Sequence, residues 1–439
     1  MISLMLDRAR LRARLALSLS ALLLAAPVGA AEEAHRTHAG PHYTLAEALQ
    51  RAEAQHPVFA SYRAQLQVAE ARRVQAALRP TPEIALEVED AFGSGTLSGY
   101  AAAQTTLSFS QLIERGGLRD RRIDVAGAER QQTVSAAEIA RLDLRAEVAR
   151  RFVHVLSHQA QLAITHEATA LAQDALDEVR RRVAAARAPL AEQSRAEVTL
   201  ARAQLEEEHA EHELLTSRRH LAAATGSVQT DFGEAEGDLL VLPPTDDFEV
   251  LLAQLQAAPD LLRYANESRL RESELRLAQA RGARGLVLGA GLRRLEASDD
   301  VGLVFSASVP LFGASRRRGE VQEAEARLGQ VASDREQAFL KAQAQLYEIY
   351  QELNHARVEV ETQRTRVVPA IEEALKQTRY AYERGRYSLL ELRDAQAEWA
   401  LQRRRLIEAA AEYHGHLIEI QRLTGQSAPG PATTELSQP

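Results

Sequence analysis

Two separate stretches of the chain, residues 82–112 and 285–312, alternate apolar and polar side chains at every second position. Successive side chains of a strand point to opposite faces, so each stretch predicts a β-hairpin with one apolar and one polar face. In the first hairpin, the leading strand sets Ile84, Leu86 and Val88 against Glu83, Glu87 and Glu89. Each strand has about the 9–11 residues that a tilted strand needs to cross a bilayer.

Two hairpins supply four strands, and four strands with one apolar face cannot close a barrel within one chain. Open strand edges are not tolerated in lipid, where no water satisfies their backbone groups. The apolar faces therefore either pack on a soluble core or meet lipid after several chains have pooled their strands.

Long polar helices are predicted for most of the remaining chain. Residues 118–186 contain no proline and are rich in Ala, Arg, Glu, Gln and Leu, so as one helix they would reach roughly 100 Å. Apolar positions spaced by threes, fours and sevens predict a coiled-coil seam: Val148, Phe152, Val155, Leu162, Thr169, Leu176 and Val183. Pro189 predicts a turn, after which a second helix returns to Gly226.

A helix is also expected to precede the first hairpin. It should begin at the capping box formed by Thr44 and Glu47 and run without interruption to about Leu78, before Pro80 and Pro82. After the returning helix, residues 227–246 are expected to form a linker with at most a short strand over residues 239–242.

The order helix, hairpin, very long helix, turn and long helix then occurs again. Ala258-Pro259 echoes His56-Pro57, and Gly425 echoes Gly226. We interpret this as a duplication of about 200 residues, with repeats over 44–226 and 247–425. Pro369 should kink or interrupt the second long helix, and residues 426–439 are expected to form a disordered tail.

The N-terminus predicts export. Four arginines precede an apolar run over residues 15–26, and small residues follow at 28–30, so residues 1–30 fit a secretory signal peptide. Residues 31–43 form a polar leader whose His35, His38 and His42 belong either to a flexible segment or to a metal-collecting tract. The chain has no cysteine, which excludes disulfides, thiolate metal sites and a lipid-modified cysteine.

Charge and motif content argue against several function classes. The net charge of -8 gives no basic surface for nucleic acid. No nucleophile and base stand out, and the glycines near residue 95 lie between strands rather than before a helix, so we expect neither an enzyme nor a bound cofactor. Histidine pairs one helical turn apart are weak candidates for zinc, the alternative being solvent-facing histidines: His154 with His158, and His209 with His212.

The segment from Tyr382 to Gln396, with Gly385, an apolar pair at 389–390 and Asp394-Ala395-Gln396, resembles the helix turn of the TolC-type outer-membrane efflux family. The likeness extends over roughly residues 44–425. The first repeat matches weakly: Leu190, Glu192 and Ala196 fit, whereas Ala186 and Pro189 replace the expected glycine and polar residue. The missing lipid-anchor cysteine and the Arg-rich start resemble the heavy-metal branch, typified by the cobalt–zinc–cadmium resistance component.

The resemblance implies a mainly α fold with a small β part, in a homotrimer with a twelve-stranded outer-membrane barrel and an α-helical tube in the periplasm. It also implies a periplasmic adaptor and an inner-membrane pump of the resistance-nodulation-division type. The turns would form a constriction lined by Glu391 and Asp394, whose acidic rings would concentrate cations. Hydrogen bonds from Tyr382 and from Arg386 or Tyr387 would hold neighbouring helices, with Glu192 as the counterpart in the first repeat. Glu83, Glu87 and Glu89 would face the lumen.

The predicted function is therefore a passive exit duct of a tripartite efflux system in the outer membrane of a Gram-negative bacterium, conducting divalent heavy-metal cations. One alternative keeps the duct but changes its cargo to drugs or secreted polypeptides. Another, of a different class, is a soluble periplasmic coiled-coil adaptor or scaffold, which requires the apolar faces of the hairpins to pack inside the protein.

Overall fold

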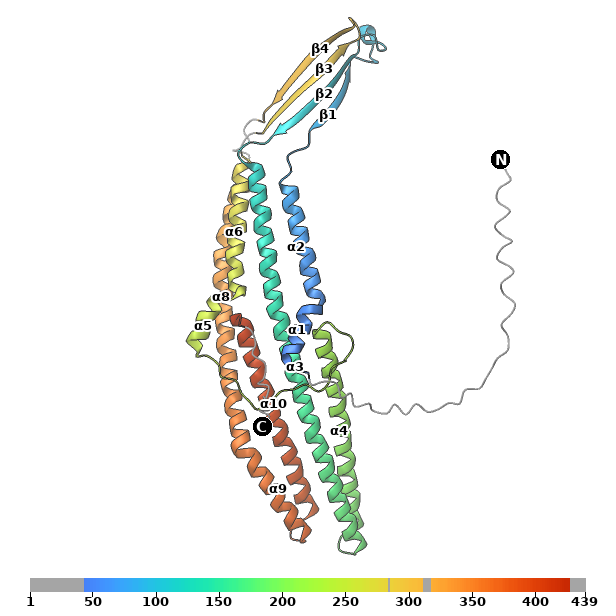
Figure 1. Cartoon of the computed structure of the whole chain (residues 1–439), viewed down its shortest axis with the longest axis vertical. Coiled ribbons are helices and arrows are strands. Elements are labelled where there is room, and N and C mark those ends of the chain that lie inside the picture. Colours follow the sequence, from blue (N-terminus) through green and yellow to red (C-terminus); the bar gives the residue numbers. More distant parts are fainter. Residues whose placement is uncertain (1–42, 283–284, 311–316, 427–439) are drawn as a thin grey trace, which may run out of the picture. The chain divides into compact units, whose positions relative to one another are not determined.

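The computed structural model describes residues 43–282, 285–310 and 317–426 (Figure 1). The predicted signal peptide, all of the leader except Tyr43, and the C-terminal tail beyond Gln426 lie outside these residues. Within the described ranges, no helix combines the length and the apolar character needed to cross a membrane.

Helices and strands occur in the predicted order in both halves of the described chain, and each half contributes two strands to the same four-stranded sheet. The first half contains α1 (Leu45–Gln55), α2 (Pro57–Ala76), β1 (Glu83–Glu89), η1 (Gly95–Leu97), β2 (Gln104–Ile113), α3 (Leu118–Ala184) and α4 (Leu190–Ala224). The second contains α5 (Phe248–Gln256), α6 (Pro259–Ala280), β3 (Leu286–Leu295), β4 (Asp300–Ser308), α8 (Arg318–Thr362), η2 (Gln363–Val367), α9 (Val368–Glu383) and α10 (Leu389–Thr424).

The two halves also end alike. Gly226 and Gly425 adopt left-handed φ angles of 84° and 73° at the ends of α4 and α10. A β-carbon on Gly226 would lie 2.9 Å from the Cα of His56, and one on Gly425 would lie 2.7 Å from the Cδ of Pro259. Each glycine thus ends the last helix of its half directly against the junction between the first two helices of that half, α1–α2 or α5–α6. This correspondence supports the duplication that we propose.

Prolines place two breaks in the helices. The predicted uninterrupted helix from Thr44 to Leu78 is wrong, because the chain turns extended at His56 (ψ 129°) and α2 restarts at Pro57. Proline disfavours helical geometry in the residue before it, and His56 caps the new helix by accepting from the Val58 amide at 3.3 Å. The predicted interruption at Pro369 is confirmed, since the ladder widens into the π turn η2 just before it.

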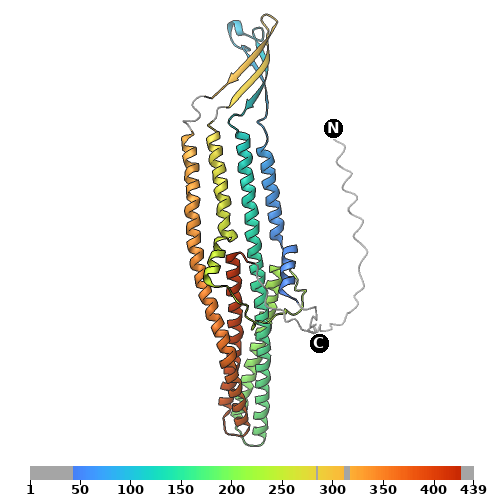
Figure 2. The same ribbon diagram turned by 60° about the vertical axis from the view of Figure 1, so that its left-hand side comes forward.

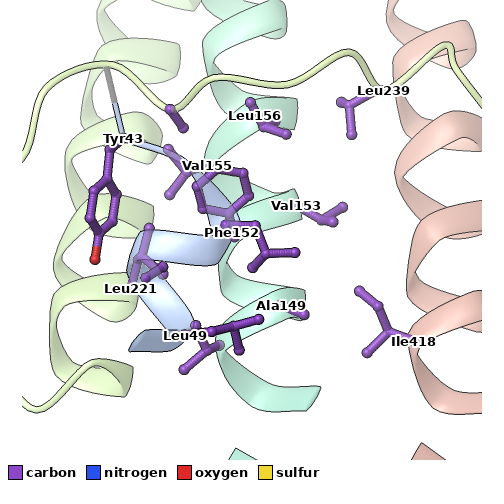
Figure 3. Packing of buried hydrophobic residues seen from close by; sticks show 14 of the residues in the cluster. Tyr43, Leu49, Ala149, Phe152, Val153, Val155, Leu156, Leu221, Leu239 and Ile418 are labelled. Carbon is purple, nitrogen blue, oxygen red and sulfur yellow. The ribbon is translucent and has the colours of Figure 1, made fainter. Parts of the chain in front are cut away.

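Helix α3, the longest element, packs against α2, α4, α6 and α10 (Figure 1). Four residues of its predicted seam are buried, namely Val148, Phe152, Val155 and Leu176, whereas Leu162, Thr169 and Val183 are only half-buried. The larger apolar core lies where α1, α3, α4 and α10 meet (Figure 3). Polar residues interrupt the seam, so its remaining positions on α3 pack less deeply against the neighbouring helices.

Residues 227–246 form part of this core. Phe232, Ala235 and Leu239 are buried, and Tyr43 pairs with Ala235 in an isolated β-bridge. Residues 239–242 form no strand, which agrees with the expectation of at most a short one, and the bridge in this described segment lies earlier. Leu239 instead lies against the helices in Figure 3 and offers its carbonyl to His414 at 3.0 Å.

The sheet has the order β1-β2-β3-β4, with every neighbouring pair antiparallel (Figure 1). Figure 2 shows the same strands at one end of the long helices. Both predicted hairpins are confirmed, and β2 pairs with β3 to join them into one sheet. Strands β1 and β4 are the two edges, and neither has a second partner among the described residues of the chain.

Candidate functional site

One face of the sheet is a continuous exposed apolar surface. The strand register aligns two rows across all four strands, namely Leu86, Leu107, Leu292 and Leu303, and then Ile84, Phe109, Ala290 and Phe305. Leu303 is 72% exposed and Phe305 77%, so this face packs on nothing within the described chain. An exposed apolar patch that crosses four strands marks a surface that meets lipid or another protein.

The opposite face is polar, and part of its acidic character is neutralised. Arg293 on β3 binds Glu89 at 3.2 Å and also donates to Thr106 at 2.9 Å and to Gln104 at 3.2 Å. Glu83 and Glu87 are exposed on this face as predicted. The predicted alternation of the two faces is therefore confirmed, and Glu89 forms an ion pair with Arg293. The lumen-facing role of the three glutamates stays a prediction.

Two helix turns lie at one end of the long helices, between α3 and α4 and between α9 and α10 (Figure 1). Gly385 in the second turn has φ 70°, and Ala186 in the first has φ 55°. Alanine therefore adopts the left-handed conformation that glycine adopts freely, at a cost of about 1–2 kcal/mol. The first turn keeps this feature of the second although its sequence departs from the family pattern.

Arg182 of α3 connects the two turns. Its guanidinium donates to the backbone carbonyl of Tyr382 at 2.7 Å and lies 4.4 Å from the centre of the Tyr382 ring. Glu178, one turn away on α3, holds the same guanidinium at 3.5 Å. The Tyr382 side chain is 1% exposed, and its burial raises the pKa of the phenol.

Tyr382 therefore links the helices by its ring and carbonyl. Its buried hydroxyl has no hydrogen-bond partner among the described residues of this chain, and the predicted hydrogen bonds of Tyr382 to neighbouring helices of an assembled channel stay a prediction. A small cavity of about 160 Å³ borders this contact and carries acidic and basic side chains, among them Asp174, Glu178 and Arg379. Arg379 binds Asp174 at 3.1 Å and so ties α9 to α3 a second time.

The other predicted gate residues have differing environments. Glu391 accepts from the amide and hydroxyl of Ser388 at 2.7 and 2.8 Å, and these hydrogen bonds lower the pKa of the Glu391 carboxyl. It thus completes the capping box that begins α10. Asp394, Arg386 and Tyr387 are largely exposed, and Glu192 is half-buried near Tyr382. Their placement in a constriction stays a prediction.

Among the described residues, neither predicted histidine pair belongs to a group of three potential metal ligands. His154 and His158 lie on α3, and His209 and His212 lie on α4. Among the described residues, one group of three potential ligands lies close together, and it consists of His166, Glu207 and Glu211. The sequence could have indicated this group, because His166 and the two glutamates lie about equally far from the turn that joins antiparallel α3 and α4.

Comparison with known proteins agrees with this architecture. The family model described as outer membrane efflux protein matches residues 48–227 and 250–426. The chain is 26% identical over 391 residues to the cobalt-zinc-cadmium resistance protein CzcC of Cupriavidus metallidurans, and the match covers 89% of this chain and 92% of that protein.

Solved structures share the fold. A membrane protein from Pseudomonas aeruginosa superimposes with a TM-score of 0.71 at 18% identity, covering 90% of this chain and 92% of that chain. CusC gives the same TM-score and identity, with coverage of 88% and 93%. VceC of Vibrio cholerae gives a TM-score of 0.68 at 16% identity, with coverage of 87% and 96%.

Proposed function

Since the chain belongs to the outer membrane efflux protein family, we propose that it forms the exit duct of a tripartite efflux system for divalent heavy-metal cations. The family establishes the coarser part of this statement, an efflux channel of the outer membrane. The cargo, the trimer, the periplasmic placement of the helices and the partner proteins are the proposed parts.

The observation that carries the proposal is the sheet. Its apolar face is exposed across four strands, and its edges β1 and β4 are unpaired within the described chain. Unpaired backbone groups are too costly to leave in lipid, so β1 of one copy has to pair with β4 of another. Three copies would give twelve strands, and their helices would continue the closed wall into the periplasm, towards an adaptor and an inner-membrane pump.

The same face argues against the scaffold alternative. A soluble adaptor requires the apolar side chains of the hairpins to pack inside the protein, whereas Ile84, Phe305 and Leu303 are all more than two-thirds exposed. Burying a large apolar side chain contributes about 1.5–3 kcal/mol, so leaving the whole row in water would forfeit a large stabilisation. Lipid supplies the missing apolar environment.

Two observations support a metal cargo. The relative of Cupriavidus metallidurans is named for cobalt, zinc and cadmium resistance. The proposed constriction also presents Asp394, which is 65% exposed and has Arg393 of its own helix at 3.5 Å. Three copies of this carboxylate would favour cations over anions. Energy for transport would come from the partner pump.

The proposal is tested by deleting the gene and measuring growth on graded Zn²⁺, Co²⁺ and Cd²⁺ and, in parallel, on a panel of drugs. We expect metal tolerance to fall and to return with the wild-type gene. A loss of drug tolerance alone would replace the metal cargo by the drug alternative. Outer-membrane fractionation followed by gel migration with and without heating tests the assembly, which should run as a heat-sensitive trimer.

A further inference from the structure

Helices α3 and α4 bring one histidine and two glutamates together on their shared surface. His166 lies on α3, and Glu207 and Glu211 lie one turn apart on α4. One ligand atom from each, the imidazole nitrogen and two carboxylate oxygens, can be chosen so that all three lie within 4.8 Å of one another. His166 is 55% exposed and Glu207 is 21% exposed, so the group is open to solvent on one side.

The contact differs from the other histidine–glutamate pairs in the described chain. His166 Nδ1 lies 2.5 Å from a Glu207 carboxylate oxygen, across two helices. His212 lies 3.8 Å from Glu208 and His355 lies 3.9 Å from Glu359, in each case one turn along the same helix. Neither of these pairs has a third ligand nearby among the described residues.

The spacing can accept a metal ion after small side-chain movements. Tetrahedral zinc with bonds of about 2.0–2.2 Å places its ligand atoms roughly 3.3–3.6 Å apart. The His166–Glu207 pair would have to widen by roughly 1 Å, and Glu211, which already lies within 4.8 Å of both, would have to adopt a comparable spacing. Glutamate side chains reach such positions by changing rotamer, without moving the helix backbone.

We propose that His166, Glu207 and Glu211 form a binding site for a divalent cation of the Zn²⁺ or Co²⁺ class, which braces α3 against α4. One imidazole with two carboxylates suits these ions, and water would complete the coordination. The cation takes the place of the direct contact between His166 and Glu207. The site is a resident one on the helix pair and does not depend on the cargo proposed for the channel.

The test is a Zn²⁺ titration of the full-length, detergent-solubilised protein by calorimetry, without a polyhistidine tag, at about pH 7.5, where imidazole is neutral. We expect His166→Gln and Glu207→Gln each to weaken one binding event per chain by at least about tenfold, the scale that even loss of an outer-shell partner produces. In the wild type, saturating Zn²⁺ should also raise the melting temperature, because the ion binds the assembled helix pair.

Matched controls separate this site from other histidines and acids of the chain. His220→Gln and Glu206→Gln change exposed residues of the same helix, α4, that lie outside the group, and both should bind Zn²⁺ as the wild type does. The visible absorption of Co²⁺ bound to the protein gives a second readout, and its bands should be weaker in Glu211→Gln than in the wild type. Equal affinity in all five variants and the wild type would overturn the site and leave an ordinary ion pair between helices, whatever the cargo experiment shows.

Discussion

Removing Arg182 should loosen the contact between the two helix turns. Arg182 makes two contacts with Tyr382. Its guanidinium donates a charge-assisted hydrogen bond to the Tyr382 carbonyl oxygen at 2.7 Å, and its Cζ lies 4.4 Å from the centre of the Tyr382 ring in a cation–π contact. Such a hydrogen bond contributes about 1.5–3 kcal/mol and such a cation–π contact about 0.5–2 kcal/mol. Because Arg182 is 19% exposed, we take the lower sum, about 2 kcal/mol per chain, which is roughly a 30-fold change in an equilibrium constant.

If opening separates the α9–α10 turn from the α3–α4 turn, Arg182→Ala favours the open channel. The measurement is single-channel conductance of the purified protein in planar bilayers, where we expect a higher open probability or larger conductance than in the wild type. Arg181→Ala is the matched control, because Arg181 is 69% exposed and pairs with Glu178 on its own helix. Indistinguishable conductance of the two variants would refute the reasoning.

Tyr382→Phe tests whether the hydroxyl of Tyr382 contributes to closing the channel, because it removes the hydroxyl and keeps the ring and the backbone carbonyl. Since the buried hydroxyl has no partner among the described residues, this variant should conduct as the wild type does. It keeps the Arg182 contacts and removes a group whose burial costs free energy. A Tyr382→Phe channel as open as Arg182→Ala would instead indicate that the hydroxyl bonds a neighbouring subunit.

Three further predictions concern assembly and stability. Leu303→Arg places a charge on the apolar face at a cost of about 2–4 kcal/mol, so the heat-sensitive trimer should be lost from the outer membrane. The control Ser308→Arg changes the polar face and should still assemble into the trimer. Gly226→Ala forces a side chain into a left-handed position facing the α1–α2 junction and should destabilise the protein by at least about 1–2 kcal/mol in thermal melts. The control Gly127→Ala, in a helix with open space around it, should be neutral or stabilising. Burial lowers the pKa of His414, so the unfolded chain binds a proton at this histidine more readily than the folded protein does, and stability should fall as the pH drops below about 6.5. His414→Gln should flatten this pH dependence of the melting temperature. An unchanged slope would show that His414 does not cause it.

Local pattern was enough for most of the secondary structure. Alternation at every second residue predicted both hairpins, and the apolar rows that cross the sheet follow from it. The same kind of reading placed the capping box at Thr44 and the interruption before Pro369. The break at His56 was also signalled locally, by Pro57, and an uninterrupted helix was the wrong interpretation of that signal.

Contacts between distant segments needed the tertiary structure. The segment after Gly226 has the composition of a linker, yet Phe232 and Leu239 are buried in the core because the neighbouring helices leave an apolar surface for them. Arg293 and Glu89 each have the pattern of an exposed strand residue, and only the pairing of β2 with β3 brings them together.

The elements and the family could be inferred from the chain alone, because periodicity, prolines, caps and the turn motif are properties of neighbouring residues. Which side chains meet depends on how the helices pack. Arg182 reaches Tyr382, and His166 reaches Glu207, only through the relative rotation and register of packed helices. That register is set by the summed packing of many side chains along α3, α4 and α9, so no single motif encodes it.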